Sequence, residues 1–145
     1  MKGKFLILVV LVMAGLVALA SRQDAQASHG AGSAMENVYA SLSAGEVDAA
    51  LASFAEGASA ENRVRAESYR GLSEIRTMLD GMQRAGRRFE IVAAEVSGDT
   101  IRAEVEVSDR GIVWGTQVVS GVLDGEHLKD FSVDAFRLEL WRIGR

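Results

Sequence analysis

The chain has 145 residues, of which 16 are basic and 20 are acidic, and its formal net charge is −4. This acidic balance argues against nucleic acid or an anionic membrane surface as a partner. Because the chain contains no cysteine, disulfides and a lipid-anchored cysteine are both excluded, and the fold must be stabilised by its hydrophobic core alone.

The N-terminal segment resembles an export signal. Two lysines precede an unbroken apolar run of 16 residues at positions 5–20, which suits a signal peptide and is shorter than the ~20 residues that span a bilayer. The small-x-small sequence at residues 25–27 is typical of a cleavage site. We therefore predict a signal peptide over residues 1–27, cleaved after Ala27, and a secreted or periplasmic protein. The alternative is an N-terminal anchor that is not cleaved.

The first helix of the mature chain is expected to begin near Met35. Residues 28–34 are small and polar and are interpreted as a flexible leader, so the folded domain is predicted to span residues 35–145. Apolar side chains then recur with the spacing of one helical face, at Met35, Val38, Tyr39 and Leu42. Gly45 suits the end of this helix, because glycine tolerates the left-handed conformation.

Two further helices are predicted before the chain changes its periodicity. Ser43 and Glu46 have the spacing of a capping box, and Gly57 is expected to end the second helix. Its apolar face is formed by Val47, Ala50, Leu51 and Phe54. A short strand and a turn are expected over residues 61–71. The third helix is predicted to end near Gly86, and its apolar face holds Leu72, Ile75, Leu79 and Met82.

From Arg87 onward the pattern is that of strands. Apolar residues alternate with charged ones over residues 101–107, which indicates a half-buried strand. Turn-forming residues separate four such segments, near positions 88–96, 101–107, 112–123 and from 128 on. Between Ala135 and Phe136 the apolar parity reverses, which predicts a β-bulge. The expected fold class is α+β, with three N-terminal helices covering one face of a strongly curved antiparallel sheet.

This order, with several short motifs, resembles the nuclear transport factor 2-like (NTF2-like) superfamily. Its SnoaL-like branch includes ketosteroid isomerases and polyketide cyclases. The motifs are Gly45-Glu46 with Asp48-Ala49, the segment 54–58, and Tyr69-Arg70-Gly71 followed by Ile75, and the match runs from about Met35 to Ile143. The resemblance implies a cone-shaped fold with a pocket at its wide end. Many members dimerise through the outer sheet face, which makes a homodimer an option for this chain.

The isomerase branch implies three functional positions. A carboxylate in the strand after the second helix acts as general base, and a count without gaps from Gly45 places Asn62 there, whose amide cannot accept a proton. Glu61 is adjacent, but neighbouring strand residues point to opposite faces. A tyrosine on the first helix donates to the oxyanion; the count gives Val38, with Tyr39 next to it. The third position, an acid on a late strand, has Asp130 and Asp134 as candidates by location only.

The related limonene-epoxide-hydrolase branch implies an Asp-Arg-Asp arrangement that activates a water. Arg102 and Glu104 share one strand face and resemble half of that arrangement, although a solvated strand face is the alternative interpretation. The candidate catalytic residues are therefore Glu61, Tyr39 and Glu104. The expected lining of the pocket comprises Tyr39, Asn62, Trp114 and Phe131.

The remaining polar residues indicate no cofactor. His29 and His127 are isolated, without the paired spacing of metal ligands, and no phosphate-binding or dinucleotide-binding motif occurs. Three arginines, at positions 84, 87 and 88, are interpreted as complementing the C-terminus of the third helix, with anion binding as the alternative.

Two hypotheses follow. The first is an exported, non-catalytic module that binds a small apolar molecule or a protein partner. The alternative is an enzyme of the isomerase, cyclase or epoxide-hydrolase type, in which Glu61 or Glu104 is the base and Tyr39 the acid or oxyanion donor. A base must lie within hydrogen-bond reach of the substrate and have a tuned pKa, so the directions of these side chains discriminate between the hypotheses.

Overall fold

The computed structural model describes residues 22–139. Its helices are α2 (Arg22–Ser43), α3 (Val47–Leu51) and α4 (Gly71–Met82). Its strands are β1 (Phe54–Asn62), β2 (Glu67–Arg70), β3 (Arg87–Ser97), β4 (Thr100–Asp109), β5 (Ile112–Asp124) and β6 (His127–Leu138). These strands form one sheet in the order β2-β1-β6-β5-β4-β3.

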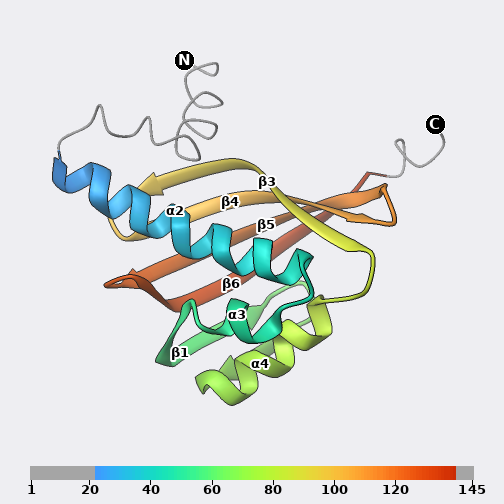
Figure 1. Cartoon of the computed structure of the whole chain (residues 1–145), viewed down its shortest axis with the longest axis horizontal. Coiled ribbons are helices and arrows are strands. Elements are labelled where there is room, and N and C mark those ends of the chain that lie inside the picture. The colour runs from blue at the N-terminus through green and yellow to red at the C-terminus, as the bar shows by residue number, and fades with distance from the viewer. Residues whose placement is uncertain (1–21, 140–145) are drawn as a thin grey trace.

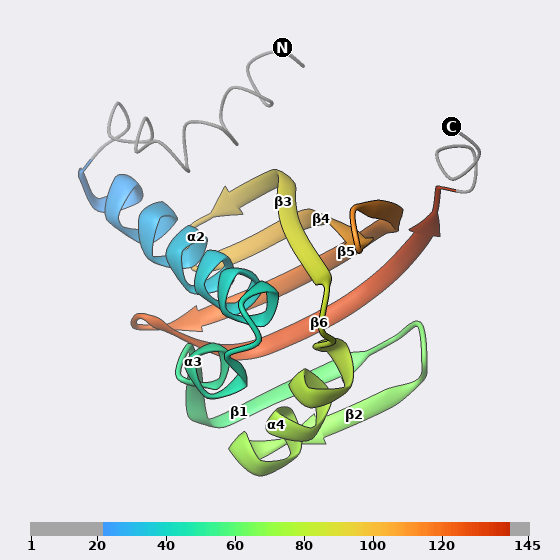
Figure 2. The same ribbon diagram turned by 45° about the vertical axis from the view of Figure 1, so that its right-hand side comes forward.

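The three helices cover one face of a bent sheet, so the predicted α+β class is confirmed (Figure 1). Helix α2 lies across the strands β3 to β6, whereas α3 and α4 lie beside β1 and β2 (Figure 2). The four long strands β3–β6 are antiparallel neighbours, as predicted. The expectation of a wholly antiparallel sheet is wrong, because β1 pairs with β6 in parallel. Strand β6 pairs with β5 along one edge and with β1, from the first half of the chain, along the other.

The first helix is longer than the sequence pattern indicated. Residues 28–34, expected to be a flexible leader, lie within α2, and Ala34 is only 3% exposed. Alanine favours helix, and burial of Ala34 extends the apolar face beyond Met35. The signal peptide stays a prediction: residues 1–21 lie outside the described part of the chain, and α2 runs through the expected cleavage point. Among residues 22–139 no helix has the length and apolarity to cross a membrane.

The predicted capping box is also wrong. Glu46 precedes α3 without a side-chain capping bond. Ser43 is instead the last residue of α2, where its hydroxyl accepts a hydrogen bond from the Phe89 amide at 2.8 Å and donates to the Phe89 carbonyl at 3.3 Å. The chain reverses at Gly45, whose φ is +77°, so Ser43 faces β3 and fastens the helix to the sheet.

The second helix ends earlier than predicted. Phe54 and Gly57, expected in that helix and at its end, belong to β1. Phe54 is nevertheless buried, because Phe54, Ala58 and Ala60 point into the core from this strand. The segment 61–71, expected to contain one short strand, holds the end of β1, a turn, β2 and the first residue of α4.

Bulges bend the long strands where the sequence pattern loses its phase. In β6, Val118 pairs with Ala135 but Val119 pairs with Val133, so Asp134 is the extra residue. This confirms the bulge that the reversed parity predicted. In β3 the register shifts between Ile91 and Ala93, which explains the blurred alternation there.

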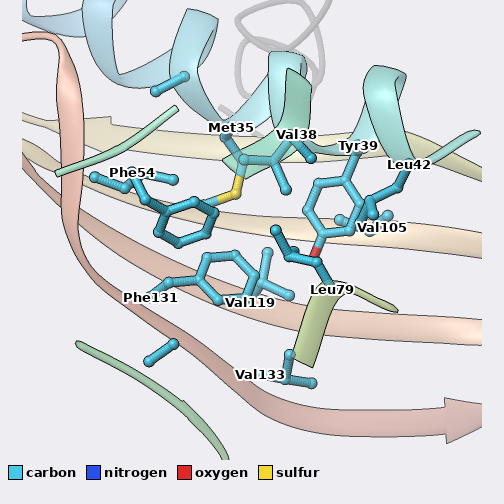
Figure 3. Packing of buried hydrophobic residues seen from close by; sticks show 14 of the residues in the cluster. Met35, Val38, Tyr39, Leu42, Phe54, Leu79, Val105, Val119, Phe131 and Val133 are labelled. Atoms are coloured by element: carbon cyan, nitrogen blue, oxygen red, sulfur yellow. The ribbon is translucent and has the colours of Figure 1, made fainter. Parts of the chain in front are cut away.

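The core lies between α2 and the sheet. The predicted helical face is confirmed, since Met35, Val38, Tyr39 and Leu42 are at most 1% exposed. Met35 and Phe54 lie together near Phe131, as Figure 3 shows, and the rings of Phe54 and Phe131 meet edge to face at 5.7 Å. Gly121 of β5 lets the helix approach, because a Cβ there would lie 3.0 Å from Met35 Cε.

Candidate functional site

At one end of the domain the core opens into a cavity of about 230 Å³, which we call the end hollow. Its walls come from the end of α4, the turn after β1, and strands β3 to β6. Its apolar side chains are Val64, Met82, Phe89, Val107, Trp114, Val133 and Phe136. Trp114 is 51% exposed, whereas Val133 and Val107 are buried. The hollow is therefore apolar inside and has a half-exposed indole at its mouth.

Four polar side chains also line the end hollow: Asn62, Arg65, Arg87 and Gln117. The Asn62 side-chain oxygen accepts a hydrogen bond from the Arg65 amide at 3.2 Å, and the Arg65 guanidinium pairs with Glu67 at 2.9 Å. No carboxylate is among the described lining residues. The described lining of the hollow thus has two cationic side chains and two amide side chains, and it has no carboxylate that could act as a general base.

Tyr39 lies beneath the hollow and connects with it through one hydrogen bond. Its hydroxyl donates to Gln117 Oε1 over 3.4 Å, and its ring lies 5.3 Å from the ring of Phe89 and 6.4 Å from that of Phe131. Figure 3 shows Tyr39 enclosed between α2 and the sheet. Burial raises the pKa of Tyr39 far above its ordinary value, so the hydroxyl is neutral and can donate but does not ionise near neutral pH.

Arg87 is held at the end of α4, as the sequence pattern predicted. One of its terminal nitrogens donates to the Met82 carbonyl at 3.0 Å, while Arg88 donates to the carbonyl of Ser43 at the end of α2. The Arg87 Nε is buried, and within the described part of the chain it has no hydrogen-bond partner. Arg87 therefore caps a helix with one group and leaves another unsatisfied.

A second cavity, the outer hollow, lies on the sheet face away from the helices, between β2, β1, β6 and β5, and measures about 440 Å³. Its polar groups bond with one another. Ser59 donates to Asp130 at 2.6 Å, and Ser132 and Ser120 both donate to Asp134. Asp130, which lines this hollow, and Asp134 beside it therefore already accept hydrogen bonds from neighbouring serines.

The structure separates the carboxylates that the sequence suggested from the end hollow. Glu61 lines the outer hollow and bonds with Arg63 at 2.5 Å. Glu104 lies on the outer sheet face, where it pairs with Arg137. Asp130 and Asp134 also face outward, into the serine network of the outer hollow.

The four residues expected to line a pocket divide in the same way. Asn62 and Trp114 line the end hollow, and Tyr39 reaches it through Gln117. Phe131 does not line it, because this ring is 2% exposed and packs in the closed core against Phe54. Phe131 belongs to a buried row on β6, and the cavity that this residue borders is the outer hollow described above.

Sequence reasoning did not identify Gln117, Arg65 and Arg87 as lining residues. Gln117 carried a usable signal: it shares the inward parity of Val119 and Gly121 on β5, and a polar side chain at an inward position marks a cavity or a buried bond. His127 is exposed. Within residues 22–139 no group of three histidines, cysteines or carboxylates comes together to hold a metal.

The family follows from a comparison with family models. The SnoaL-like domain model matches residues 35–137, and this range covers α3, α4 and all but the last residue of the sheet. The chain has the NTF2-like fold. It belongs to the SnoaL-like domain family. A comparison with curated proteins gives no match.

Solved structures with the same fold have little sequence in common with this chain. An NTF2-like protein of unknown function from Burkholderia xenovorans is 16% identical, with a TM-score of 0.61 over 78% of this chain and 90% of that one. A LEH-like epoxide hydrolase from M. tuberculosis is 18% identical (TM-score 0.57; 79% and 86% covered). A hypothetical protein with a ketosteroid isomerase-like fold from Catenulispora acidiphila, in complex with trimethylamine, is 14% identical (0.59; 76% and 88%). At these identities the likeness concerns the fold.

Proposed function

We propose that the domain is a binding module for a small, mainly apolar molecule, which lies in the end hollow. The observation that carries this proposal is an apolar opening into the core with a half-exposed Trp114 at its mouth. Concave, mostly apolar sites with a few placed polar groups are typical of small-molecule binding. A ligand that covers the indole of Trp114 removes a large apolar surface from water, which favours binding.

The composition of the hollow supports binding over acid–base catalysis. A general base must lie within reach of the substrate proton, and the described lining residues include no carboxylate. Glu61 and Glu104 both lie on the outer side of the sheet in ion pairs with Arg63 and Arg137. A ligand in the end hollow would therefore be held next to amides and arginines.

The test is a screen of the purified protein against a panel of small apolar and aromatic molecules, read first by thermal shift and then by calorimetry. A ligand that binds only the folded state stabilises it by about 2.7 kcal/mol at a hundredfold excess over Kd. If no member of a chemically broad panel raises the Tm, the proposal loses its support.

A pair of variants at Gly81 locates the ligand. Gly81 is in α4, lines the end hollow, and has no atom within 4 Å of a built Cβ. Gly81→Ala should bind like the wild type, because its methyl group meets no atom within 4 Å, and should be at least as stable, because alanine favours helix over glycine. Gly81→Phe should keep the fold and lose the ligand, since the ring occupies the hollow. Unchanged binding by a folded Gly81→Phe would place the ligand elsewhere, for instance in the outer hollow.

An isomerase-, cyclase- or epoxide-hydrolase-type enzyme is the second candidate, favoured by the hydrogen bond that brings the Tyr39 hydroxyl to the lining residue Gln117. Turnover of any ligand found in the screen would be assayed directly. If turnover occurs, Glu61→Gln and Glu104→Gln decide whether either carboxylate is the base. Turnover by the wild-type protein would overturn the binding-only proposal, and its loss in a folded Glu61→Gln or Glu104→Gln variant would identify the base.

We also propose that the protein is exported, on the strength of the two lysines, the apolar run and the small-x-small sequence within residues 1–27. Intact mass measurement of the protein recovered from the medium or periplasm of a bacterial host should give a chain that begins at Ser28. Recovery of the full-length chain in the membrane fraction would support the uncleaved anchor instead.

A further inference from the structure

We propose that the ligand of the end hollow carries an acid group, a carboxylate on a compact apolar body, and that Arg87 binds this group. The inference rests on the proposed function and specifies the chemistry of the ligand. The charge of the lining argues for an acid. Among the described residues that line the hollow, the ionisable side chains are Arg65 and Arg87, and both are cationic.

Arg87 is the better placed of the two arginines. The Arg65 side chain is 70% exposed and already pairs with Glu67, so its charge is largely compensated and hydrated. No ion pair joins Arg87 to a carboxylate within residues 22–139. The nearest acidic residue along the ladder is Asp109, directly opposite Arg87 on β4, and its carboxylate faces Arg110 at 4.0 Å.

The hydrogen bonding of Arg87 explains how its guanidinium could bind a carboxylate. Its bond to the Met82 carbonyl fixes one terminal nitrogen at the end of α4, which orients the planar guanidinium. The buried Nε has no partner in the described part of the chain, and an unmet buried donor is costly. The protein itself covers the Nε, but the second terminal nitrogen is neither fully buried nor bonded within the described residues. A carboxylate in the hollow can accept from this nitrogen and compensate the charge of the guanidinium.

The rest of the hollow sets the shape of the ligand. The side chains of Phe89, Val107, Val133 and Phe136 offer only apolar contact, while Trp114 covers one side of the mouth. The volume of about 230 Å³ is below the range of roughly 300–1,000 Å³ usual for drug-sized ligands. A medium-chain or one- to two-ring carboxylic acid fits this combination of size, apolar wall and single cationic anchor.

The experiment compares acids with their neutral amides of the same shape, octanoate with octanamide and naphthoate with naphthamide, by calorimetry on the purified wild-type protein. Because a hydrogen bond to a charged group contributes more than a neutral one, each acid should bind at least about tenfold more tightly than its amide. Equal affinities of acid and amide would overturn the inference and leave the proposed function standing. Absence of binding by all four molecules and by the broader apolar panel would overturn both.

Variants test whether Arg87 causes the preference for acids over amides. Arg87→Gln should weaken acid binding to the level of the amide and leave the amide unchanged, and Arg87→Lys should restore part of the preference. Arg84→Gln is the matched control, since Arg84 is exposed and lies outside the hollow; it should behave like the wild type. Retention of the full preference in Arg87→Gln would refute the role of Arg87.

Arg87→Gln also removes a cap of α4, so a second variant guards against loss of the fold. Asn62→Asp leaves Arg87 in place and adds a negative charge to the lining, and its side-chain oxygen can still accept from the Arg65 amide. At neutral pH it should weaken the binding of both acids several-fold more than that of the amides. If Asn62→Asp binds acid and amide as the wild type does, the acid group does not lie in the end hollow and the inference fails.

Discussion

The hydroxyl of Tyr39 and the side-chain oxygen of Gln117, 78 residues apart in the chain, lie 3.4 Å from each other. Tyr39 belongs to the buried face of α2 and Gln117 to the lining of the end hollow. The pair is therefore the polar connection between the first helix and the candidate site, and it sits among the aromatic rings of Phe89 and Phe131.

Tyr39→Phe tests the strength of this connection. The variant keeps the ring and its packing but removes the donor, so we expect the free energy of unfolding to fall by about 0.5–1.5 kcal/mol. Tyr39→Ala, which also empties part of the core, should cost about 3–5 kcal/mol. Urea unfolding measures both. A Tyr39→Phe variant that loses as much stability as Tyr39→Ala would contradict the structure.

The buried hydroxyl also predicts how stability changes with pH. Burial raises the pKa of Tyr39 above its ordinary value of 10.0, so the unfolded chain releases this proton at a lower pH than the folded chain does. The contribution of the protonated hydroxyl is complete below pH 10.0 and decreases above it, with a slope of up to about 1.4 kcal/mol per pH unit. Urea midpoints measured through the alkaline range should fall in the wild type.

Variants at the two tyrosines separate their contributions. Partial burial, followed by a hydrogen bond from Tyr69 to Glu67, also raises the pKa of Tyr69. Tyr39→Phe should remove most of the alkaline loss of stability, and Tyr69→Phe should leave most of it. The opposite result would show that the Tyr39 hydroxyl is accessible to solvent.

Three glycine-to-alanine variants should differ according to the atoms that the new methyl group meets. At Gly115 a Cβ would lie 2.2 Å from the Arg137 carbonyl oxygen, a backbone atom that β6 holds in place. At Gly121 the nearest atom is Leu128 Cδ2, 2.8 Å away at the end of a flexible side chain. At Gly57 nothing lies within 4 Å.

We expect Gly121→Ala to cost about 1–3 kcal/mol, as overpacked core positions do, and Gly115→Ala to cost more. Gly57→Ala should stay within about 0.5 kcal/mol of the wild type. Thermal unfolding of the three proteins gives the order directly. A Gly115→Ala variant as stable as Gly57→Ala would mean that β5 and β6 are farther apart than described.

Ser43 and Glu46 distinguish the structure from the capping-box prediction. Ser43→Ala removes both hydrogen bonds with Phe89 and leaves two backbone groups of β3 without partners, so we expect a loss of about 1–3 kcal/mol. Glu46→Ala removes no capping bond and should change stability by less than about 0.5 kcal/mol. Chemical denaturation measures both variants, and a Glu46→Ala variant that loses as much stability as Ser43→Ala would indicate a capping box after all.

Periodicity predicted the elements in which one face is buried without interruption. The face formed by Met35, Val38, Tyr39 and Leu42 fixed the helix, and the alternation from Ile101 to Val107 fixed β4, because in each case burial repeats with the period of the backbone. Phe54 was misassigned for the same reason. Its distance from Leu51 fits a helix, yet the strand that follows α3 carries it into the same core.

The candidate site was only partly accessible to such arguments. Asn62 and Trp114 were identified as lining residues, but the hollow is made by the ends of elements that lie far apart in the sequence. Which arginine of the cluster after α4 turns toward it depends on where the helix ends and β3 begins. Glu61 looked catalytic until the pairing of β1 with β2 and β6 fixed its direction, since Glu61 pairs with Ser132 on the outer face.

The parallel pairing of β1 with β6 has a consequence for synthesis of the chain. Strand β1 leaves the ribosome early, and β6, which completes its hydrogen bonds, is the last of the described strands to be made. Until then β1 has one open edge, and β5 gains its second neighbour at the same late moment. Unpaired edges invite pairing with other chains, so a product truncated before β6 should aggregate rather than persist as a smaller domain.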